Sequence, residues 1–387
     1  MSWDQLNEAS EEAFAQGYYL EALNLLNQAV PEAEKDPAKL AVTLYRLGKV
    51  CVHLQEIDRA EAVLTRALAI SGKVLGLEHA EVARVIDQLG NVYAYQNKFA
   101  EAEPLLTRAL EMRRKLLGNA HPEVAETLLS LGTLHTRQRN YGQAELFLRD
   151  ALEMQHQLLG ENHTAVAETL GLLAMLFYKQ NVYQESARFA QKAAAIREQA
   201  LGLHPDLAMS LHIVAMNHAA MKEYDEALKM YDRVLTIRLR FFAPEHELVT
   251  SVMRAIGMIY MRTRRFAEAQ ALFEDLERQA EKSSNIDDLL FAMKQIAWLF
   301  VFQRNFDAGQ VYVTNTLRRL QSLGKQAERA KDNLTMALFC CHVGQKDYLA
   351  AISALPAAAQ VLHRNRSVDK IMFKRGFQAG IHAGKQN

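Results

Sequence analysis

The sequence predicts an all-α protein, a right-handed α-solenoid of about nine helical hairpins packed one against the next. Its main sign is repetition: the stretch from Gly90 to Gly132 is followed by a near-copy of itself, and further copies recur about every 42 residues. Half of the 387 residues are hydrophobic and only seven are proline, which favours helices over loops or disorder. A repeated chain grows by adding units against its neighbours, so this length does not require several globular domains.

Small residues mark both helices of each predicted unit. One lies in the first helix and another lies twelve positions later in the second helix, where the two axes must approach closely. The pairs are Gly48/Ala60, Gly90/Ala102, Gly132/Ala144, Ala174/Ser186, Ala215/Ala227, Gly257/Ala269 and Ala297/Gly309. An aromatic or aliphatic residue opens each second helix, and an asparagine near it in several units predicts a short turn. The opening residues are Tyr19, Ile57, Phe99, Tyr141, Tyr183, Tyr224, Phe266, Phe306 and Tyr348.

A repeated signal predicts where the second helices end and the next first helices begin. Leu-Gly pairs end at Gly76, Gly118, Gly160 and Gly202, and glycine there can take the left-handed conformation that closes a helix. A histidine follows each pair or its equivalent, and two of them precede a proline, which favours the first helical position. These histidines are His79, His121, His163, His204 and His246.

Together these marks resemble tetratricopeptide repeats, in the 42-residue form found in kinesin light chains and related bacterial proteins. The resemblance is carried by LGNAHPEVAETLLSLGTLHTRQRNYGQAELFLRDALEM, from Leu117 to Met154, and by its copies. It is strong from Leu40 to Lys282 and weak before and after. We therefore expect a solenoid over residues 1–282, divergent capping repeats over 283–362, and a basic tail or final capping helix over 363–387. Sustained heptads are missing, so the coiled coil that joins kinesin light chains to the motor is not expected here.

Composition excludes several classes of function. Lys plus Arg and Asp plus Glu both number 45, so a nucleic-acid binder, which normally carries a basic excess, is not expected. Three cysteines, two of them adjacent (Cys340 and Cys341), form no disulfide framework and fit a reducing compartment. The first residues show no signal-peptide pattern, and no run of about 18 apolar residues is present. We expect a soluble, cytoplasmic protein without a membrane span.

Catalytic and metal sites are not expected. Equivalent histidines of successive repeats should lie about 8–10 Å apart, so they cannot meet at one zinc ion and more simply begin helices. Sequences of the HExxH, P-loop, GxSxG and CxxC types are absent. We predict no catalytic residue, no metal ligand and no cofactor.

The predicted binding surface is a stripe along the first helices, which line the concave groove of such arrays. Its later part is rich in Met and aromatic residues with cations between them, a composition suited to an adaptable apolar groove and to acidic ligands. Met and aromatic residues at helical spacing also fill cores, and that alternative stays open. The candidate partner-binding residues are Asn91, Tyr95, Arg137, Met175, Tyr178, Lys179, Met216, Arg254, Met258, Arg262, Lys294 and Trp298. The resemblance implies that Asn91 would hydrogen-bond a ligand's backbone, and that the ligand would carry a tryptophan among acidic residues.

We therefore predict a non-enzymatic scaffold or adaptor that binds a peptide or partner segment, acidic and with aromatic or apolar anchors, in the concave groove. Two alternatives remain at this point. The chain can associate with further copies of itself through the groove or the basic tail, or it can act as a peptide-sensing regulator. No appended effector domain is visible, which makes the regulator the least favoured of the three.

Overall fold

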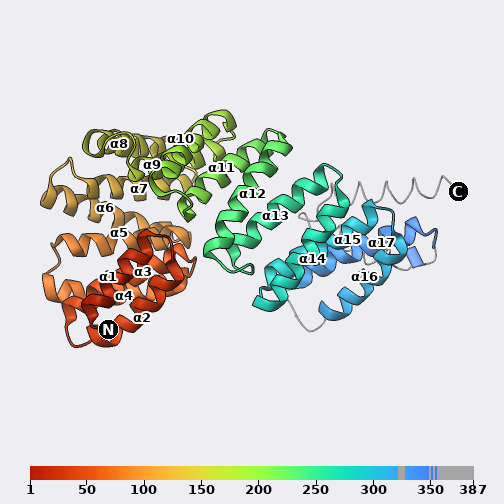
Figure 1. The fold of residues 1–387 in the computed structure, drawn as a ribbon, viewed down its shortest axis with the longest axis horizontal. Coiled ribbons are helices and arrows are strands. Elements are labelled where there is room, and N and C mark those ends of the chain that lie inside the picture. The colour runs from red at the N-terminus through yellow and green to blue at the C-terminus, as the bar shows by residue number, and fades with distance from the viewer. Residues whose placement is uncertain (321–326, 348–349, 352–353, 355–387) are drawn as a thin grey trace. The chain divides into compact units, whose positions relative to one another are not determined.

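The computed structural model describes residues 1–320, 327–347, 350, 351 and 354, and Figure 1 shows that this part of the chain is helical. It holds seventeen helices, paired in chain order as first and second helices of successive hairpins. The first helices are α1 (Trp3–Ala15), α3 (Pro37–His53), α5 (Ala80–Tyr95), α7 (Pro122–Arg137), α9 (Thr164–Lys179), α11 (Pro205–Ala220), α13 (Glu247–Arg262), α15 (Ile286–Phe302) and α17 (Glu328–Gly344). The second helices are α2 (Tyr19–Ala33), α4 (Ile57–Leu75), α6 (Phe99–Leu117), α8 (Tyr141–Leu159), α10 (Tyr183–Leu201), α12 (Tyr224–Phe241), α14 (Phe266–Ser283) and α16 (Phe306–Arg319).

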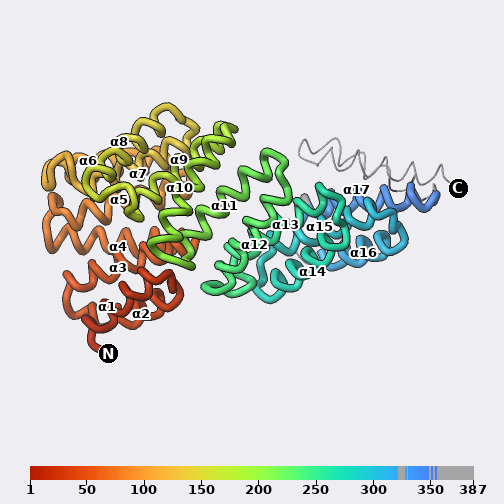
Figure 2. The backbone as a smooth tube through the Cα atoms, turned by 45° about the horizontal axis from the view of Figure 1, so that its top comes forward, coloured from red at the N-terminus to blue at the C-terminus, as the bar shows by residue number. Residues whose placement is uncertain are grey.

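Contacts divide the chain into two compact units, which we call unit 1 (residues 1–237) and unit 2 (residues 238–387). In each unit a first helix packs on its own second helix, and the second helix packs on the next first helix, as the tube in Figure 2 lets the reader follow. This confirms the predicted all-α solenoid of helical hairpins. The division predicted after residue 282 concerns the regularity of the repeats and stays a prediction. The tail predicted over 363–387 lies outside the described residues.

Close approach of the paired helices explains the small residues. A Cβ atom added to Gly90 would lie 2.6 Å from Leu106 Cδ2, and one added to Gly132 would lie 2.6 Å from Leu148 Cδ2. Both leucines are fully buried. A larger residue in the first helix would therefore displace a core leucine of the second helix, which accounts for the small residue in each unit.

The helix ends differ from expectation in one detail. The backbone of Gly76 has φ 82° and ψ 162°, and that of Gly118 has φ 88° and ψ 171°. The predicted left-handed conformation has ψ near +47°, so these glycines instead occupy a region of positive φ and extended ψ that is open essentially to glycine alone. The chain thus leaves the second helix in an extended direction, and the next first helix begins a few residues later.

The periodic histidines begin the first helices, as predicted. In each case Nδ1 accepts a hydrogen bond from the backbone N–H two residues further on, at 3.1–3.2 Å. The pairs are His79 with Glu81, His121 with Glu123, His163 with Ala165, His204 with Asp206 and His246 with Leu248. Histidine therefore satisfies a free N–H group of the first turn, a role more often taken by Ser, Thr, Asp or Asn.

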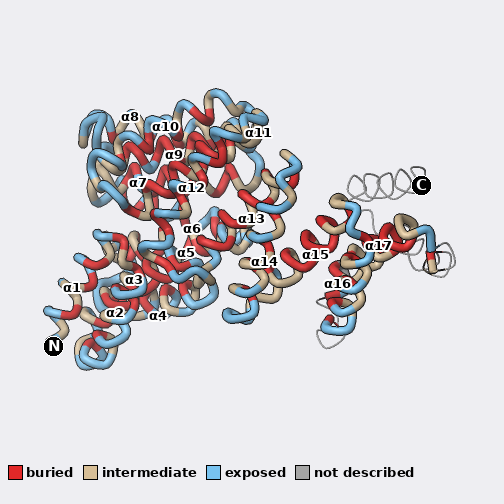
Figure 3. Tube along the Cα trace, turned by 45° about the vertical axis from the view of Figure 1, so that its right-hand side comes forward, coloured by how far each residue is buried: buried red, intermediate tan, exposed pale blue. Residues whose placement is uncertain are grey.

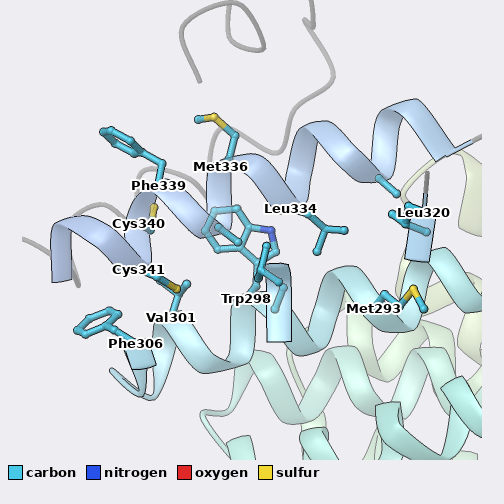
Figure 4. Close-up of a cluster of buried hydrophobic side chains, with 14 of the residues drawn as sticks. Met293, Trp298, Val301, Phe306, Leu320, Leu334, Met336, Phe339, Cys340 and Cys341 are labelled. Carbon is cyan, nitrogen blue, oxygen red and sulfur yellow. The ribbon is translucent and has the colours of Figure 1, made fainter. Parts of the chain in front are cut away.

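Buried residues gather where the helices face one another (Figure 3). In unit 2 the core is built around Trp298 of α15, which lies beneath α17 with Leu334 beside it (Figure 4). Cys340 and Cys341 also lie in this core, and burial raises the pKa of the Cys341 thiol to about 12. Among the described residues, no helix combines the length and the hydropathy needed to cross a membrane.

Candidate binding surface on the first helices

The first helices line the inner side of unit 1. Helix α3 contacts α5, α5 contacts α7, α7 contacts α9 and α9 contacts α11, in addition to the contacts within each hairpin. In a curved stack the elements that approach most closely lie on the inside. The first helices that carry the unit 1 part of the predicted stripe therefore lie on the inside of unit 1.

Side chains on this surface are reached by water and yet closely surrounded by protein. Tyr95, at the end of α5, is 39% exposed, and Glu168 of α9 is also exposed. Even so, the surrounding protein removes enough water to raise the pKa of the Tyr95 hydroxyl and of the Glu168 carboxyl. A side chain on the wall of a concave surface is reached by water but still loses part of its hydration to the surrounding protein, as Tyr95 and Glu168 do.

Charges act across this surface between helices that are not neighbours. Burial raises the pKa of Tyr45 in α3, and the carboxylate of Glu126 in α7 adds to that rise. Glu126 and Asp206 similarly raise the pKa of Glu168, whereas Arg197 and Lys49 oppose that rise. Side chains from α3, α7, α9 and the start of α11 therefore share one electrostatic environment.

An arginine that the sequence prediction missed holds one junction between hairpins. Arg113 of α6 is 1% exposed, and its guanidinium donates to the backbone oxygen of Glu123 at 2.6 Å and to Thr127 Oγ1 at 2.7 Å. It also lies 3.9 Å from the buried carboxylate of Asp87. Burial raises the pKa of Asp87 to about 6, against the opposing effect of Arg113. The pair of Asp87 and Arg113 lies beneath the inner surface and holds α6 against α5 and α7.

The same junction recurs at the spacing of the repeat. Arg197 donates to the backbone oxygen of Asp206 at 3.1 Å and to Ser210 Oγ at 2.8 Å. Arg238 donates to the backbone oxygen of Leu248, and Gln155 takes the equivalent place by accepting from Thr169 Oγ1 at 2.5 Å. Periodicity alone could have found these residues, because each lies 41 or 42 positions after the previous one.

Three predicted site residues belong to α5 and α7. Asn91 Nδ2 donates to Ser130 Oγ at 2.8 Å, so its amide links two helices. Arg137 donates to the backbone oxygens of Ala94 and Tyr95, at 2.8 and 2.9 Å, and so caps the end of α5. Its guanidinium also lies 5.1 Å from the Tyr95 ring. Tyr95 remains the most accessible of the three, whereas Asn91 and Arg137 already have partners within the protein.

Four more predicted residues lie on α9 and α11. Met175 is half-buried and packs against a buried cluster that contains Ile213 and Val214, and Met216 is also half-buried. The Tyr178 ring lies 5.5 Å from that of Tyr183, and Lys179 is exposed. These side chains form the continuation of the stripe beyond Tyr95.

The predicted residues of unit 2 have different surroundings. Trp298 is 1% exposed, which corrects its expected place in a groove: it is a core residue under α17. Arg254 forms an ion pair at 3.0 Å with Asp288, which is buried, and Lys294 lies over the ring of Phe291 at 5.4 Å. Met258 is half-buried and Arg262 is exposed. Arg254 is thus engaged by an acid of its own unit.

No metal site appears among the residues that the structure describes: His, Cys, Asp and Glu side chains nowhere gather in threes in a way that could hold an ion.

The sequence matches the model of a tetratricopeptide repeat family over residues 39–115, 99–155, 123–199 and 206–282, which is more than half of the chain. No curated protein sequence matches it.

Solved structures with a similar fold are distant in sequence. The signal transduction ATPase with numerous domains that carries a tetratricopeptide repeat sensor, from Pyrococcus horikoshii, is 13% identical with a TM-score of 0.64, and the match covers 92% of this chain and 55% of that one. The apo form of RapI is 14% identical with a TM-score of 0.57, covering 90% and 98%. Nearly identical TPR-like repeats of a kinesin light chain-type protein from Podosopora anserina are 22% identical with a TM-score of 0.45, covering 54% and 99%.

Proposed function

Because the chain belongs to the tetratricopeptide repeat family, we propose that it is a non-enzymatic interaction scaffold whose unit 1 binds an extended segment of a partner protein along its inner surface. The main observation behind this proposal is that the side chain of Glu168 is exposed and yet has a raised pKa. This carboxylate is open to water, desolvated by the surrounding helices, and without an ion-pair partner in the described part of the chain. A charged group held in this way gains from a ligand that pairs with it.

The charges of this surface favour a ligand with basic side chains. Glu126 and Glu168 occupy the same place in successive repeats, so about 8–10 Å should separate them. An extended peptide advances about 3.3 Å per residue, so Lys or Arg side chains about three residues apart would reach both carboxylates. The acidic ligand expected from the sequence relied on cations of unit 2, of which Arg254 is already paired with Asp288.

Apolar and polar contacts on either side of the carboxylates would complete recognition. Tyr95 offers an exposed ring at the end of α5, and Met175 and Met216 offer flexible thioethers on α9 and α11. Lys179, exposed at the end of α9, would meet a carboxylate of the ligand. We therefore place Tyr95, Glu126, Glu168 and Met175 at the centre of the surface.

Selection from a displayed library of random peptides tests this proposal. Peptides selected on the full chain should be enriched in Lys and Arg. Their affinity should fall roughly 10-fold or more in Glu168→Lys, because like charges then face each other. The matched control is Glu111→Lys, an exposed position of α6 with the same change of charge.

The proposal fails if the selected peptides bind Glu168→Lys and wild type equally well, or lose the same affinity in the control. Light scattering over a dilution series examines the alternative of self-association. A mass that rises with concentration and falls to that of one chain in Glu168→Lys would show that the ligand is a second copy of the chain.

A further inference from the structure

The turn between α1 and α2 lies against the start of α11, although nearly 190 residues separate them. The Tyr19 hydroxyl donates to Asp206 Oδ1 at 3.3 Å. A Cβ atom added to Gly17, which is buried and has φ +82°, would lie 2.5 Å from Pro205 Cδ and 2.9 Å from His204 Nε2. The first hairpin of unit 1 therefore touches the sixth, in addition to its contacts with the second.

The surroundings of His204 show that this contact is specific to one junction. The capping histidines His79, His121 and His246 are half-buried and His163 is exposed, whereas His204 is 6% exposed. All five cap a helix in the same way, so the additional burial of His204 comes from the first hairpin. The backbone of Ala15, at the end of α1, also lies near the His204 ring and raises its pKa.

Aromatic side chains continue the contact onto the inner surface. His53, at the end of α3, lies 4.7 Å from the Tyr19 ring and 5.0 Å from the Phe14 ring. Lys49 Nζ lies 5.1 Å from the centre of the Phe14 ring. Lys49 and His53 belong to the same stripe as Asn91 and Tyr95, so the first hairpin meets α11 beside the proposed binding surface.

We propose that the α1–α2 hairpin is a gate, which docks on the start of α11 to enclose the inner surface of unit 1 and separates from α11 to admit a partner segment. The gate rests on the proposed function for its purpose, but its opening can be measured without any ligand. Its contact with α11 is made by the short stretch from Ala15 to Tyr19, whereas the hairpin also packs on α3 through α2. Separation from α11 therefore leaves the hairpin's other packing in place.

Acid should favour the open gate. Burial lowers the pKa of His204, so its ring is neutral at pH 7 while the gate is closed. Asp206 and the backbone of Ala15 oppose this effect, whereas Arg197 lowers the pKa of His204 further. An open gate would return the pKa of His204 toward the ordinary value of about 6.5, whereas His53 would stay packed against the hairpin. As the pH falls through about 6.5 the open form thus binds more protons than the closed form, and closure weakens.

Electron spin labels test the gate in the full chain. Glu12→Cys on α1 and Leu203→Cys before α11 are exposed labelling positions, whereas the three native cysteines are buried. At pH 7.5 the distance distribution should have one short component, and at pH 5 a longer component should grow. Tyr19→Phe keeps the ring but removes the hydroxyl, so it should enlarge the open fraction roughly 10-fold at pH 7.5, as expected for loss of a hydrogen bond to a charged group.

A matched pair of variants separates the gate from general effects of acid. His204→Asn keeps a good capping residue but does not titrate, so it should reduce the growth of the long component at pH 5. His121→Asn makes the same change at an equivalent junction away from the gate and should leave that growth unaltered. Circular dichroism checks that helix content is constant. An identical distribution at both pH values in wild type and Tyr19→Phe would overturn the gate, whatever the peptide selection shows.

Discussion

Asn91 in unit 1 and Trp298 in unit 2 occupy the same place in their repeats, but their surroundings are opposite. Asn91 is half-buried beside an inner surface and bonds to Ser130 of the next first helix. Trp298 is sealed in a core by α17, its ring stacked at 6.0 Å on that of Phe302. The position of a residue in the repeat is therefore insufficient to define a binding surface. Whether that position is exposed depends on how the next helices pack over it.

The charged residues differ between the units in the same way. In unit 1, Glu168 is exposed to solvent and lacks an ion-pair partner in the described part of the chain. In unit 2, Arg254 forms an ion pair with the buried Asp288. A charge paired inside its own unit has already recovered the cost of losing water, and an outside ligand would have to displace its partner. The difference favours unit 1 as the place of recognition.

Removal of the Trp298 side chain should have the largest effect among the variants that test this comparison. Trp298→Ala should reduce the free energy of unfolding by about 3–5 kcal/mol, because it leaves a cavity beneath α17. Denaturant unfolding followed by circular dichroism measures the loss. Peptides selected on unit 1 should keep their affinity for the variant. A stability equal to that of wild type would show that Trp298 is not part of the core.

The buried pair of Asp87 and Arg113 predicts a smaller effect that depends on pH. The pKa of Asp87 is raised to about 6 in the folded protein, above the ordinary value of about 3.9, so its contribution is greatest below pH 4 and is lost as the pH rises through 6. The difference in unfolding free energy between wild type and Asp87→Asn should change by on the order of 2–3 kcal/mol between pH 4 and 7.5. Denaturant titrations at several pH values measure it, and a difference independent of pH would contradict the raised pKa.

Substitution of Asn91 should have the smallest effect. Asn91→Ala removes its hydrogen bond to Ser130 and should reduce the free energy of unfolding by about 1 kcal/mol. Ser130 keeps its bond to Asp87 at 3.2 Å, so it is not left without a partner. If Asn91 instead serves only a ligand, the variant should unfold like wild type while peptide affinity falls. Thermal unfolding and peptide titration on the same sample distinguish the two outcomes.

The repeat made most of the fold predictable. Glycines at close helix contacts, Leu-Gly pairs at helix ends and histidines at helix starts all mark local geometry, and local geometry repeats with the sequence. Gly90 is a good example, because its distance from Leu106 depends only on residues of its own hairpin.

The binding surface was less predictable because it depends on contacts between distant parts of the chain. The sequence indicates that Trp298 lies on a first helix, but its burial requires α17, more than thirty residues later. The sequence gives no sign that Arg137 has a partner, but in the fold its guanidinium donates to a backbone oxygen at the end of α5. The contact of Tyr19 with Asp206 arises from the curvature of five hairpins, and curvature accumulates from small rotations that no single motif encodes.

The junctions held by Arg113, Gln155, Arg197 and Arg238 are alike in kind, because each side chain bonds with the opening turns of the following first helix. Loss or duplication of one whole hairpin would therefore bring together ends that already match in chemistry. Such exchange would alter the length of the array without requiring a new type of interface.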